Sequence, residues 1–290
     1  MEQHQLAGKG GHTISLYTME AQNPFCKLQI VHDAGENAST YEDVMKELTQ
    51  RGISCSAMNL RGHDNTKSDQ CPLFFSTRNG WNNVVDDIHV VDSFLATDQL
   101  PHFLLGVGMG ADLIRTYLFK FGETLQGALL LGATPYVNAL SFGIVDFFAD
   151  HLTGRFGELY RSPLLASWAF ERGFHPLKRR KTRYNANRKK EETIPTLSLI
   201  RDLSRGLKNL QEEHSTAYIP RELPLLFMAG TQDSIAGGRG KQEALVDFYS
   251  SMGKNAQLIL YKNGAHDLLH GECKDLVIND LERFLKETSQ

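Results

Sequence analysis

A short apolar run that enters a glycine-rich turn and leaves it as a helix is the most constraining feature of this sequence. Residues 102–111 read His-Phe-Leu-Leu-Gly-Val-Gly-Met-Gly-Ala, and a helical pattern continues from Met109 to Phe121. Glycine adopts the backbone conformations of such a tight turn most easily. The segment predicts strand, sharp turn and helix, the setting of the G-x-S-x-G nucleophile elbow. The middle position here is Gly108, so the turn is present but the serine is not.

Short apolar runs alternate with helical patterns along most of the chain. This alternation predicts βαβ units and a mostly parallel sheet, and strands buried on both faces read as continuous apolar runs, as these do. The expected strands are residues 13–18, 28–32, 54–60, 102–105, 127–131, 225–229 and 257–261. The expected helices are residues 41–51, 81–96, 109–121, 242–251 and 274–287.

The alternation breaks between Pro135 and Pro224, where helical patterns occur without convincing strands. We therefore expect an α/β core formed by residues 1–135 and 223–290, with a helical cap inserted at 136–222. A basic cluster runs from Lys178 to Lys190 within this insertion. This cluster can be interpreted as a solvated loop or as a phosphate-binding segment, and we favour the solvated loop.

Composition and charge argue against several classes of function. The net charge of −3 gives no sign of a nucleic-acid partner. No apolar run is long enough to span a bilayer, and residues 1–11 lack the apolar stretch of a signal peptide. The cysteines show no metal or redox spacing. We expect a cytoplasmic protein with reduced thiols, no metal, no cofactor and no stable membrane anchor; its oligomeric state is open.

Three polar segments follow expected strands, at the edge of the sheet where α/β proteins build their sites. The first, residues 32–37, contains Asp33 and Ala34 and is placed to turn backbone N–H groups toward the elbow, as an oxyanion hole requires. The second ends at Asp233, and an aspartate there can accept from a histidine Nδ1–H. The third carries His266 on a loop that can reach the elbow.

With these segments the chain resembles the lysophospholipase and monoacylglycerol-lipase group of the α/β hydrolases. The order of elbow, Asp233 and His266 is that of the α/β-hydrolase triad. The group's H-G-x-G-E-H, L-R-G-H-G and G-H-S-M-G segments correspond to H-D-A-G-E-N at 32–37, L-R-G-H-D at 60–64 and G-V-G-M-G at 106–110. Four further matches are the segments at 41–52, 203–210, 230–233 and 264–267. The resemblance covers most of the chain and is weakest over 140–195.

The resemblance implies an α/β-hydrolase fold, with a mostly parallel central sheet, flanking helices and an inserted helical cap. It also implies an ancestral hydrolysis of a glycerol ester or a lysophospholipid. In that reaction Gly108 marks the nucleophile position, His266 acts as general base and then acid, and Asp233 orients His266. The oxyanion hole and elbow would comprise Asp33, Ala34, Gly106, Val107, Met109 and Gly110.

Three departures lie at this one site: Asp33 stands for a glycine, Val107 for a histidine and Gly108 for the serine. A carboxylate at position 33 would oppose an oxyanion unless it points away. We therefore expect an impaired or altered ester hydrolase, acting on a small ester or lipid-like compound. The alternatives are a non-catalytic protein that binds an acyl or lipid-like ligand, or an inactivated variant of an active enzyme. In each case His266 should be hydrogen-bonded to Asp233 and face Gly108.

The same glycine-rich turn also fits the dinucleotide fingerprint G-x-G-x-x-A, over residues 106–111. That motif expects an early βαβ unit and an acidic residue at the end of the next strand. The next expected strand instead ends in Leu131-Gly132-Ala133-Thr134, without an acid. Dinucleotide binding is therefore the less favoured interpretation.

Overall fold

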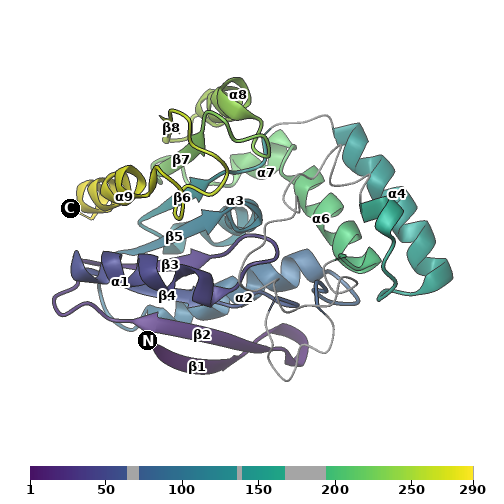
Figure 1. The fold of residues 1–290 in the computed structure, drawn as a ribbon, viewed down its shortest axis with the longest axis horizontal. Helices are drawn as coiled ribbons and strands as arrows, with labels where there is room; N and C mark the ends of the chain where they lie inside the picture. The colour runs from purple at the N-terminus through teal and green to yellow at the C-terminus, as the bar shows by residue number, and fades with distance from the viewer. Residues whose placement is uncertain (64–71, 136–138, 167–193, 290) are drawn as a thin grey trace.

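A mostly parallel sheet of eight strands forms the centre of the computed structural model, which describes residues 1–63, 72–135, 139–166 and 194–289 (Figure 1). The strands are β1 (Glu2–Ala7), β2 (Thr13–Met19), β3 (Cys26–Val31), β4 (Ile53–Met58), β5 (His102–Val107), β6 (Gly127–Leu131), β7 (Leu225–Gly230) and β8 (Ala256–Tyr261). Their order across the sheet is β1-β2-β4-β3-β5-β6-β7-β8. β2 runs antiparallel to both β1 and β4, and all other neighbours are parallel. The predicted strands are all present; β6 has the predicted bounds, and the ends of the others differ by a few residues.

β1 is the strand that the sequence analysis missed. It pairs with β2 from Glu2 opposite Thr18 to Ala7 opposite Thr13, at the edge of the sheet. Its residues are mostly polar, and they alternate between exposed and half-buried positions. An edge strand with solvent on one side needs no continuous apolar run, and polar side chains keep such an edge from pairing with other chains. The apolar signal that identified the central strands is therefore absent from β1.

Helices cover both faces of the sheet because each face of a parallel sheet must be buried. The helices of the α/β part are α1 (Glu42–Gln50), α2 (Gly80–Leu95), α3 (Met109–Phe121), α8 (Gly238–Ser251) and α9 (Lys274–Thr288), with short 3-10 turns η1 (Lys9–Gly11), η2 (Ala38–Tyr41) and η3 (Gly122–Thr124). One apolar cluster joins α1 and α9 to the sheet, and a second joins α2, α3 and α8 to it. Each fully buried leucine or isoleucine in these clusters contributes about 1.5–3 kcal/mol by leaving water. α3 has the predicted bounds, while α8 begins at Gly238 instead of Gln242.

The segment between β6 and β7 contributes α4 (Ala139–Phe156), α6 (Leu197–Asn209) and α7 (Glu213–Ala217). α4 packs against α6 and forms one end of the molecule in Figure 1. Arg205 of α6 binds Asp146 and Asp150 of α4 at 2.7 and 3.0 Å. Helices were expected here, and the division into core and cap stays a prediction. The basic cluster at 178–190 lies outside the described residues.

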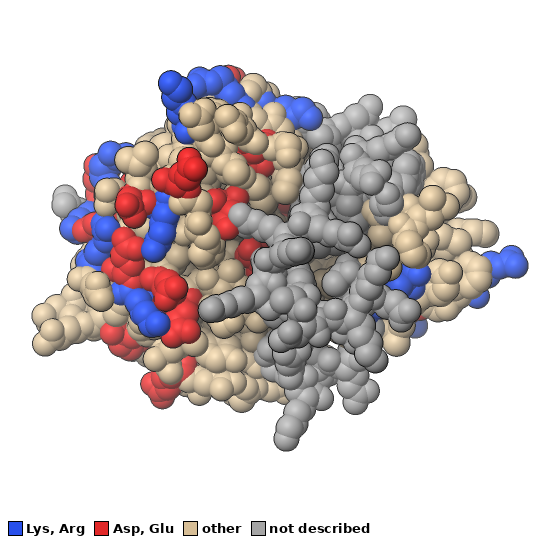
Figure 2. Space-filling view, viewed as in Figure 1, with Lys and Arg blue, Asp and Glu red and all other residues tan. Residues whose placement is uncertain are grey.

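Charged side chains of both signs are mixed over the described part of the core surface in Figure 2. No helix among the described residues is long and apolar enough to cross a membrane. Cys26, Cys55 and Cys273 are buried free thiols, and burial raises the pKa of Cys26 to about 12. Cys71 lies outside the described residues.

Candidate functional site

Four residues singled out by the sequence follow the carboxyl ends of parallel strands. Asp33 comes after β3, Gly108 after β5, Asp233 after β7 and His266 after β8. These ends open on the same edge of the sheet, where α/β proteins bind their ligands. The topology therefore brings together residues that lie up to 233 positions apart in the chain.

The turn between β5 and α3 has the sharp geometry that the sequence predicted. Gly108 has φ 53° and ψ −116°, a backbone conformation that side chains disfavour. Gly110 is also needed: a Cβ there would lie 2.0 Å from the carbonyl oxygen of Val31. At Gly106 a Cβ would lie 2.5 Å from the backbone of α3. Val107 is buried in the apolar cluster beneath α1 and α9. These residues let α3 pack closely against the sheet.

Asp233 and His266 form the hydrogen bond that the sequence analysis expected. The distance from Asp233 Oδ2 to His266 Nδ1 is 2.8 Å. The other carboxylate oxygen, Oδ1, accepts from the backbone N–H groups of Ile235 and Ala236 at 2.8 and 2.9 Å. Asp233 is almost fully buried. Its position is therefore fixed by its own turn, and one oxygen remains for the imidazole.

Asp33 points into the site, and its carboxylate binds backbone N–H donors there, which the sequence analysis did not anticipate. Its Oδ1 accepts from the backbone N–H groups of Ala34 and Met109 at 2.7 and 2.8 Å. The sequence analysis expected the N–H groups of Met109 and of the loop after β3 to bind an oxyanion. The other oxygen, Oδ2, lies 3.2 Å from His266 Nε2. Asp33 thus neither points away nor leaves the donors free; its own carboxylate binds them.

Gly108 makes room for this carboxylate. An ideal Cβ at position 108 would lie 2.1 Å from Asp33 Oδ1, 2.3 Å from its Cγ and 2.7 Å from its Oδ2. Real Cβ atoms essentially never approach other heavy atoms so closely. Asp33 therefore fills the space that any side chain at position 108 would enter, and it lies between Gly108 and His266.

Two carboxylates keep His266 protonated. Burial disfavours the charged ring, but the hydrogen bonds to Asp233 and Asp33, together with their negative charges, outweigh it and raise the pKa of His266 to about 10. At neutral pH both ring nitrogens therefore carry a proton, and both donate. A doubly protonated imidazole has no lone pair with which to take a proton from water or from a hydroxyl group.

His32 is a supporting residue whose role the sequence analysis did not recognise. Burial, followed by the charge of His63, lowers the pKa of His32 to about 3, so its ring is neutral. Its Nδ1 donates to the carbonyl oxygen of Asp33 at 2.8 Å, and its Nε2 accepts from the Leu60 N–H at 3.0 Å. The ring thereby joins the Asp33 loop to the end of β4. The histidine that begins the H-D-A-G-E-N segment was the available signal.

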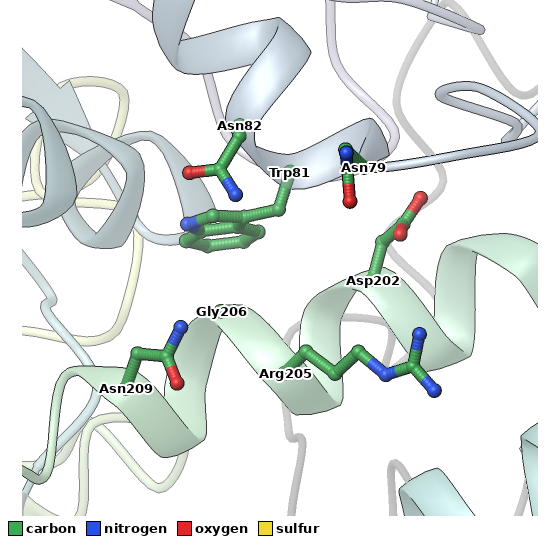
Figure 3. Close-up of a pocket in the computed structure, with 7 residues that line it drawn as sticks. All are labelled: Asn79, Trp81, Asn82, Asp202, Arg205, Gly206 and Asn209. Carbon is green, nitrogen blue, oxygen red and sulfur yellow. The ribbon is translucent and has the colours of Figure 1, made fainter.

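A small pocket of about 50 Å³ lies elsewhere, between α6 and the first turn of α2 (Figure 3). In Figure 3, Asp202 reaches from α6 toward the end of α2 that carries Asn79 and Trp81. Asp202 accepts from the Gly80 N–H, and burial raises its pKa to about 7. We place the candidate site at His266 instead, because its polar groups converge there and the pocket contains none of them. Within the described ranges, no group of three or more His, Cys, Asp or Glu residues is arranged to hold a metal ion.

Solved structures with the same architecture include esterases and lipases. A thermostable carboxyl esterase from Bacillus coagulans, in complex with glycerol, superposes with a TM-score of 0.83 at 17% identity over 100% of this chain and 99% of that one. A soluble variant of monoglyceride lipase from Saccharomyces cerevisiae, in complex with a substrate analogue, gives 0.74 at 15% identity over 100% and 96%. A monoacylglycerol lipase from Paleococcus ferrophilus gives 0.65 at 14% identity over 94% and 99%.

A comparison with curated protein sequences gives no significant match. At the identities found among the solved structures, the likeness establishes the α/β-hydrolase fold. The family follows from the sequence itself, because residues 22–273, most of the chain, match the family described as serine aminopeptidase, S33. The chain therefore belongs to the serine aminopeptidase S33 family of α/β hydrolases.

Proposed function

We propose that this chain is an esterase- and lipase-like hydrolase in which ester hydrolysis through a serine acyl-enzyme is lost or strongly impaired. The observation that carries this proposal is the position of the Asp33 carboxylate, bound to the N–H groups of Ala34 and Met109 and pressed against Gly108. In an ester hydrolase, donors of this kind stabilise the oxyanion of the tetrahedral intermediate. Here an ester carbonyl would have to displace a charged carboxylate to reach them.

Two further requirements of acyl transfer are unmet. Gly108 has no side chain to attack an acyl carbon, and removing the serine of a catalytic triad costs about a million-fold in rate in a well-studied protease. His266 is protonated at neutral pH, so it cannot act as the general base that would activate water instead. Catalytic groups and substrate-binding groups are therefore altered together.

We propose small esters and acyl compounds as the ligand class of this site. The structurally similar proteins include a carboxyl esterase with glycerol and a monoglyceride lipase with a substrate analogue. Binding of such a compound without turnover would define a binding protein. Turnover would define an altered enzyme.

The experiment measures hydrolysis of p-nitrophenyl butyrate and labelling by a fluorophosphonate probe. We expect the natural chain to show neither. The double variant Asp33→Gly/Gly108→Ser removes the carboxylate and supplies a hydroxyl, and we expect it to gain both labelling and turnover. The matched control is Asp33→Gly/Gly108→Ala, which opens the site in the same way without a nucleophile. Fluorophosphonate labelling or burst kinetics in the natural chain would contradict the proposal.

A further inference from the structure

We propose that the pocket between α2 and α6 binds a small primary ammonium compound, with the nitrogen of the ligand on the carboxylate of Asp202. This inference goes beyond the proposed function, because the pocket shares no residue with the site around His266. α2 follows β4 in the chain, whereas α6 belongs to the segment between β6 and β7. A ligand bound here therefore joins two parts of the chain that are far apart in sequence.

Asp202 supplies the recognising group, which is a buried carboxylate oxygen. The residue is only 4% exposed, and it lines the pocket. In Figure 3 its side chain extends from α6 toward the first turn of α2. Among the described residues, none donates a hydrogen bond to Oδ2 of Asp202. Because buried polar atoms are normally hydrogen-bonded, this oxygen is the one in the pocket with most to gain from a donor.

Two glycines make room for this arrangement. A Cβ at Gly80 would lie 2.0 Å from Oδ2 of Asp202, and a Cβ at Gly206 would lie 2.2 Å from the Trp81 ring. α2 and α6 can therefore approach this closely only because both positions lack a side chain. The Trp81 ring is held in place by its indole N–H, which donates to Oγ1 of Thr116 at 2.9 Å. The floor of the pocket is thus a buried carboxylate beside a fixed apolar ring.

The charges around Asp202 favour a cation as the ligand. Burial raises the pKa of Asp202, Arg201 and the Gly80 N–H lower it, as does Arg205, and Glu158 raises it further. Both guanidinium groups are bound to other carboxylates: Arg205 to two of α4 at 2.7 and 3.0 Å, and Arg201 to Glu158 at 2.8 Å. In the described part of the chain, Asp202 is therefore the carboxylate of this cluster that neither guanidinium binds.

An ammonium fits this pocket better than a metal ion does. Calcium and magnesium are held by roughly six oxygen ligands or more, and over the described ranges no three His, Cys, Asp or Glu residues are arranged to hold a metal. An ammonium brings its own N–H donors, so that one carboxylate can bind it strongly. The amides of Asn79 and Asn209, which also line the pocket, can accept its other protons. The volume of about 50 Å³ has room for about four water-sized groups, at about 10–15 Å³ each.

The test measures binding of ethylammonium chloride to the full chain by calorimetry at about pH 8 and about pH 6. The ligand keeps its charge at both values, since alkylamines have a pKa of about 10. Asp202, with a pKa of about 7, is mostly ionised at the higher value and mostly protonated at the lower one. We expect saturable binding that weakens about tenfold at the lower pH, the ratio of the two ionised fractions. His266 stays protonated at both values because its pKa is about 10.

Asp202→Asn keeps the shape of the side chain and removes its charge. It should weaken ethylammonium binding at about pH 8 by at least about tenfold, the order expected for a hydrogen bond to a charged group. Two matched ligands, ethanol as a neutral analogue of the same size and potassium chloride as a cation without N–H donors, should not bind. On addition of ethylammonium, the NMR signals of the Gly80 amide and the Trp81 indole should shift in the natural chain and stay unchanged in the variant.

Each opposite result overturns the proposal. No saturable binding at about pH 8 would mean that Asp202 is bound by solvent alone, and potassium binding as tight as ethylammonium would contradict the ammonium assignment. Unchanged binding in Asp202→Asn would place the ligand elsewhere. Should that variant fail to fold, the natural protein decides alone, since equal affinities at the two pH values also exclude Asp202. None of these outcomes depends on ester hydrolysis, so the proposed function stands or falls separately.

Discussion

The two carboxylates on either side of His266 are bound in nearly the same way and depend on different parts of the chain. Each accepts two backbone N–H groups on Oδ1 and faces a nitrogen of His266 with Oδ2. The donors to Asp233 lie two and three residues further along its own turn. One donor to Asp33 is its neighbour Ala34, and the other is Met109, 76 positions away.

This difference separates a local arrangement from one that needs the whole fold. The turn after β7 supplies both N–H donors to the Asp233 carboxylate. Asp33 keeps its position only because Met109 begins a helix at the elbow and because Gly108 has no side chain. The half of the site around Asp233 should therefore tolerate changes elsewhere, while the half around Asp33 should respond to a single methyl group at position 108.

The largest expected effect is the loss of stability when Gly108, beside Asp33, is given a side chain. Gly108→Ala places a Cβ 2.1 Å from Asp33 Oδ1 and forces a side chain onto a backbone with φ 53°. We expect a loss of about 3 kcal/mol or more in the free energy of unfolding, from collision and backbone strain together. In the Asp33→Gly background the collision disappears and only the strain remains. Denaturant unfolding of the four proteins should give a coupling of about 2 kcal/mol; additive losses would mean that the two positions do not interact.

The next effect concerns the imidazole. Asp33→Asn and Asp233→Asn each remove one negative partner of His266, and burial then favours the neutral ring. We expect the pKa of His266, about 10 in the natural protein, to fall by about one pH unit or more in either variant. The fall should be greater for Asp233→Asn, because Asp233 makes the shorter bond. An NMR titration of the ring measures both values, and an unchanged pKa in Asp33→Asn would show that Asp33 does not face the ring in solution.

Stability should fall in alkaline solution. The pKa of His266 is about 10 in the folded protein, against an ordinary histidine value of 6.5, so its protonated form favours folding. This contribution is complete below about pH 6.5 and is lost as the pH rises toward 10, by at most about 1.4 kcal/mol per pH unit. Thermal melts from pH 6 to about 10 in the natural protein and in His266→Gln measure it, since the variant lacks this titration. Equal slopes would contradict the ion-paired imidazolium.

The smallest effect should come from Asp202, a buried carboxylate without an imidazolium partner. Its pKa is about 7 in the folded protein, against an ordinary aspartate value of 3.8, so folding favours the protonated form. Stability should therefore decline from about pH 4 to 7 and then level off, by at most about 1.4 kcal/mol per pH unit. Asp202→Asn should flatten this acidic window and leave the alkaline window of His266 unchanged. Melts that still decline equally between pH 4 and 7 would assign the titration to another group.

The central architecture could be predicted because buried strands and helices require apolar residues in a regular pattern along the sequence. β6 and α3 have the predicted bounds, and the other predicted strands and helices are displaced by a few residues. β1 was not predicted because an edge strand needs no continuous apolar run. The hydrogen bond between Asp233 and His266 could be anticipated because both follow strands that end at the same edge of the sheet.

The direction of the Asp33 side chain could not be read in the same way. It depends on empty space beside Gly108 and on the N–H of Met109, which belong to a different strand and helix. The sequence analysis considered charge repulsion between Asp33 and an oxyanion, and did not consider that the carboxylate could itself bind the donors. The replacements of glycine by Asp33 and of serine by Gly108 were the available signal. Only the three-dimensional structure shows that the carboxylate of Asp33 occupies the space beside Gly108.

The space beside Gly108 has a consequence for how these positions can vary among related proteins. Asp33 in its present orientation excludes alanine, serine and every larger residue at 108, because each carries the same Cβ. An aspartate at position 33 can therefore hold this orientation only beside a glycine at 108. Where a relative carries a serine at 108, a small residue such as glycine should stand at 33. We therefore expect positions 33 and 108 to vary together, because a chain that changed only one of them would pass through a less stable intermediate.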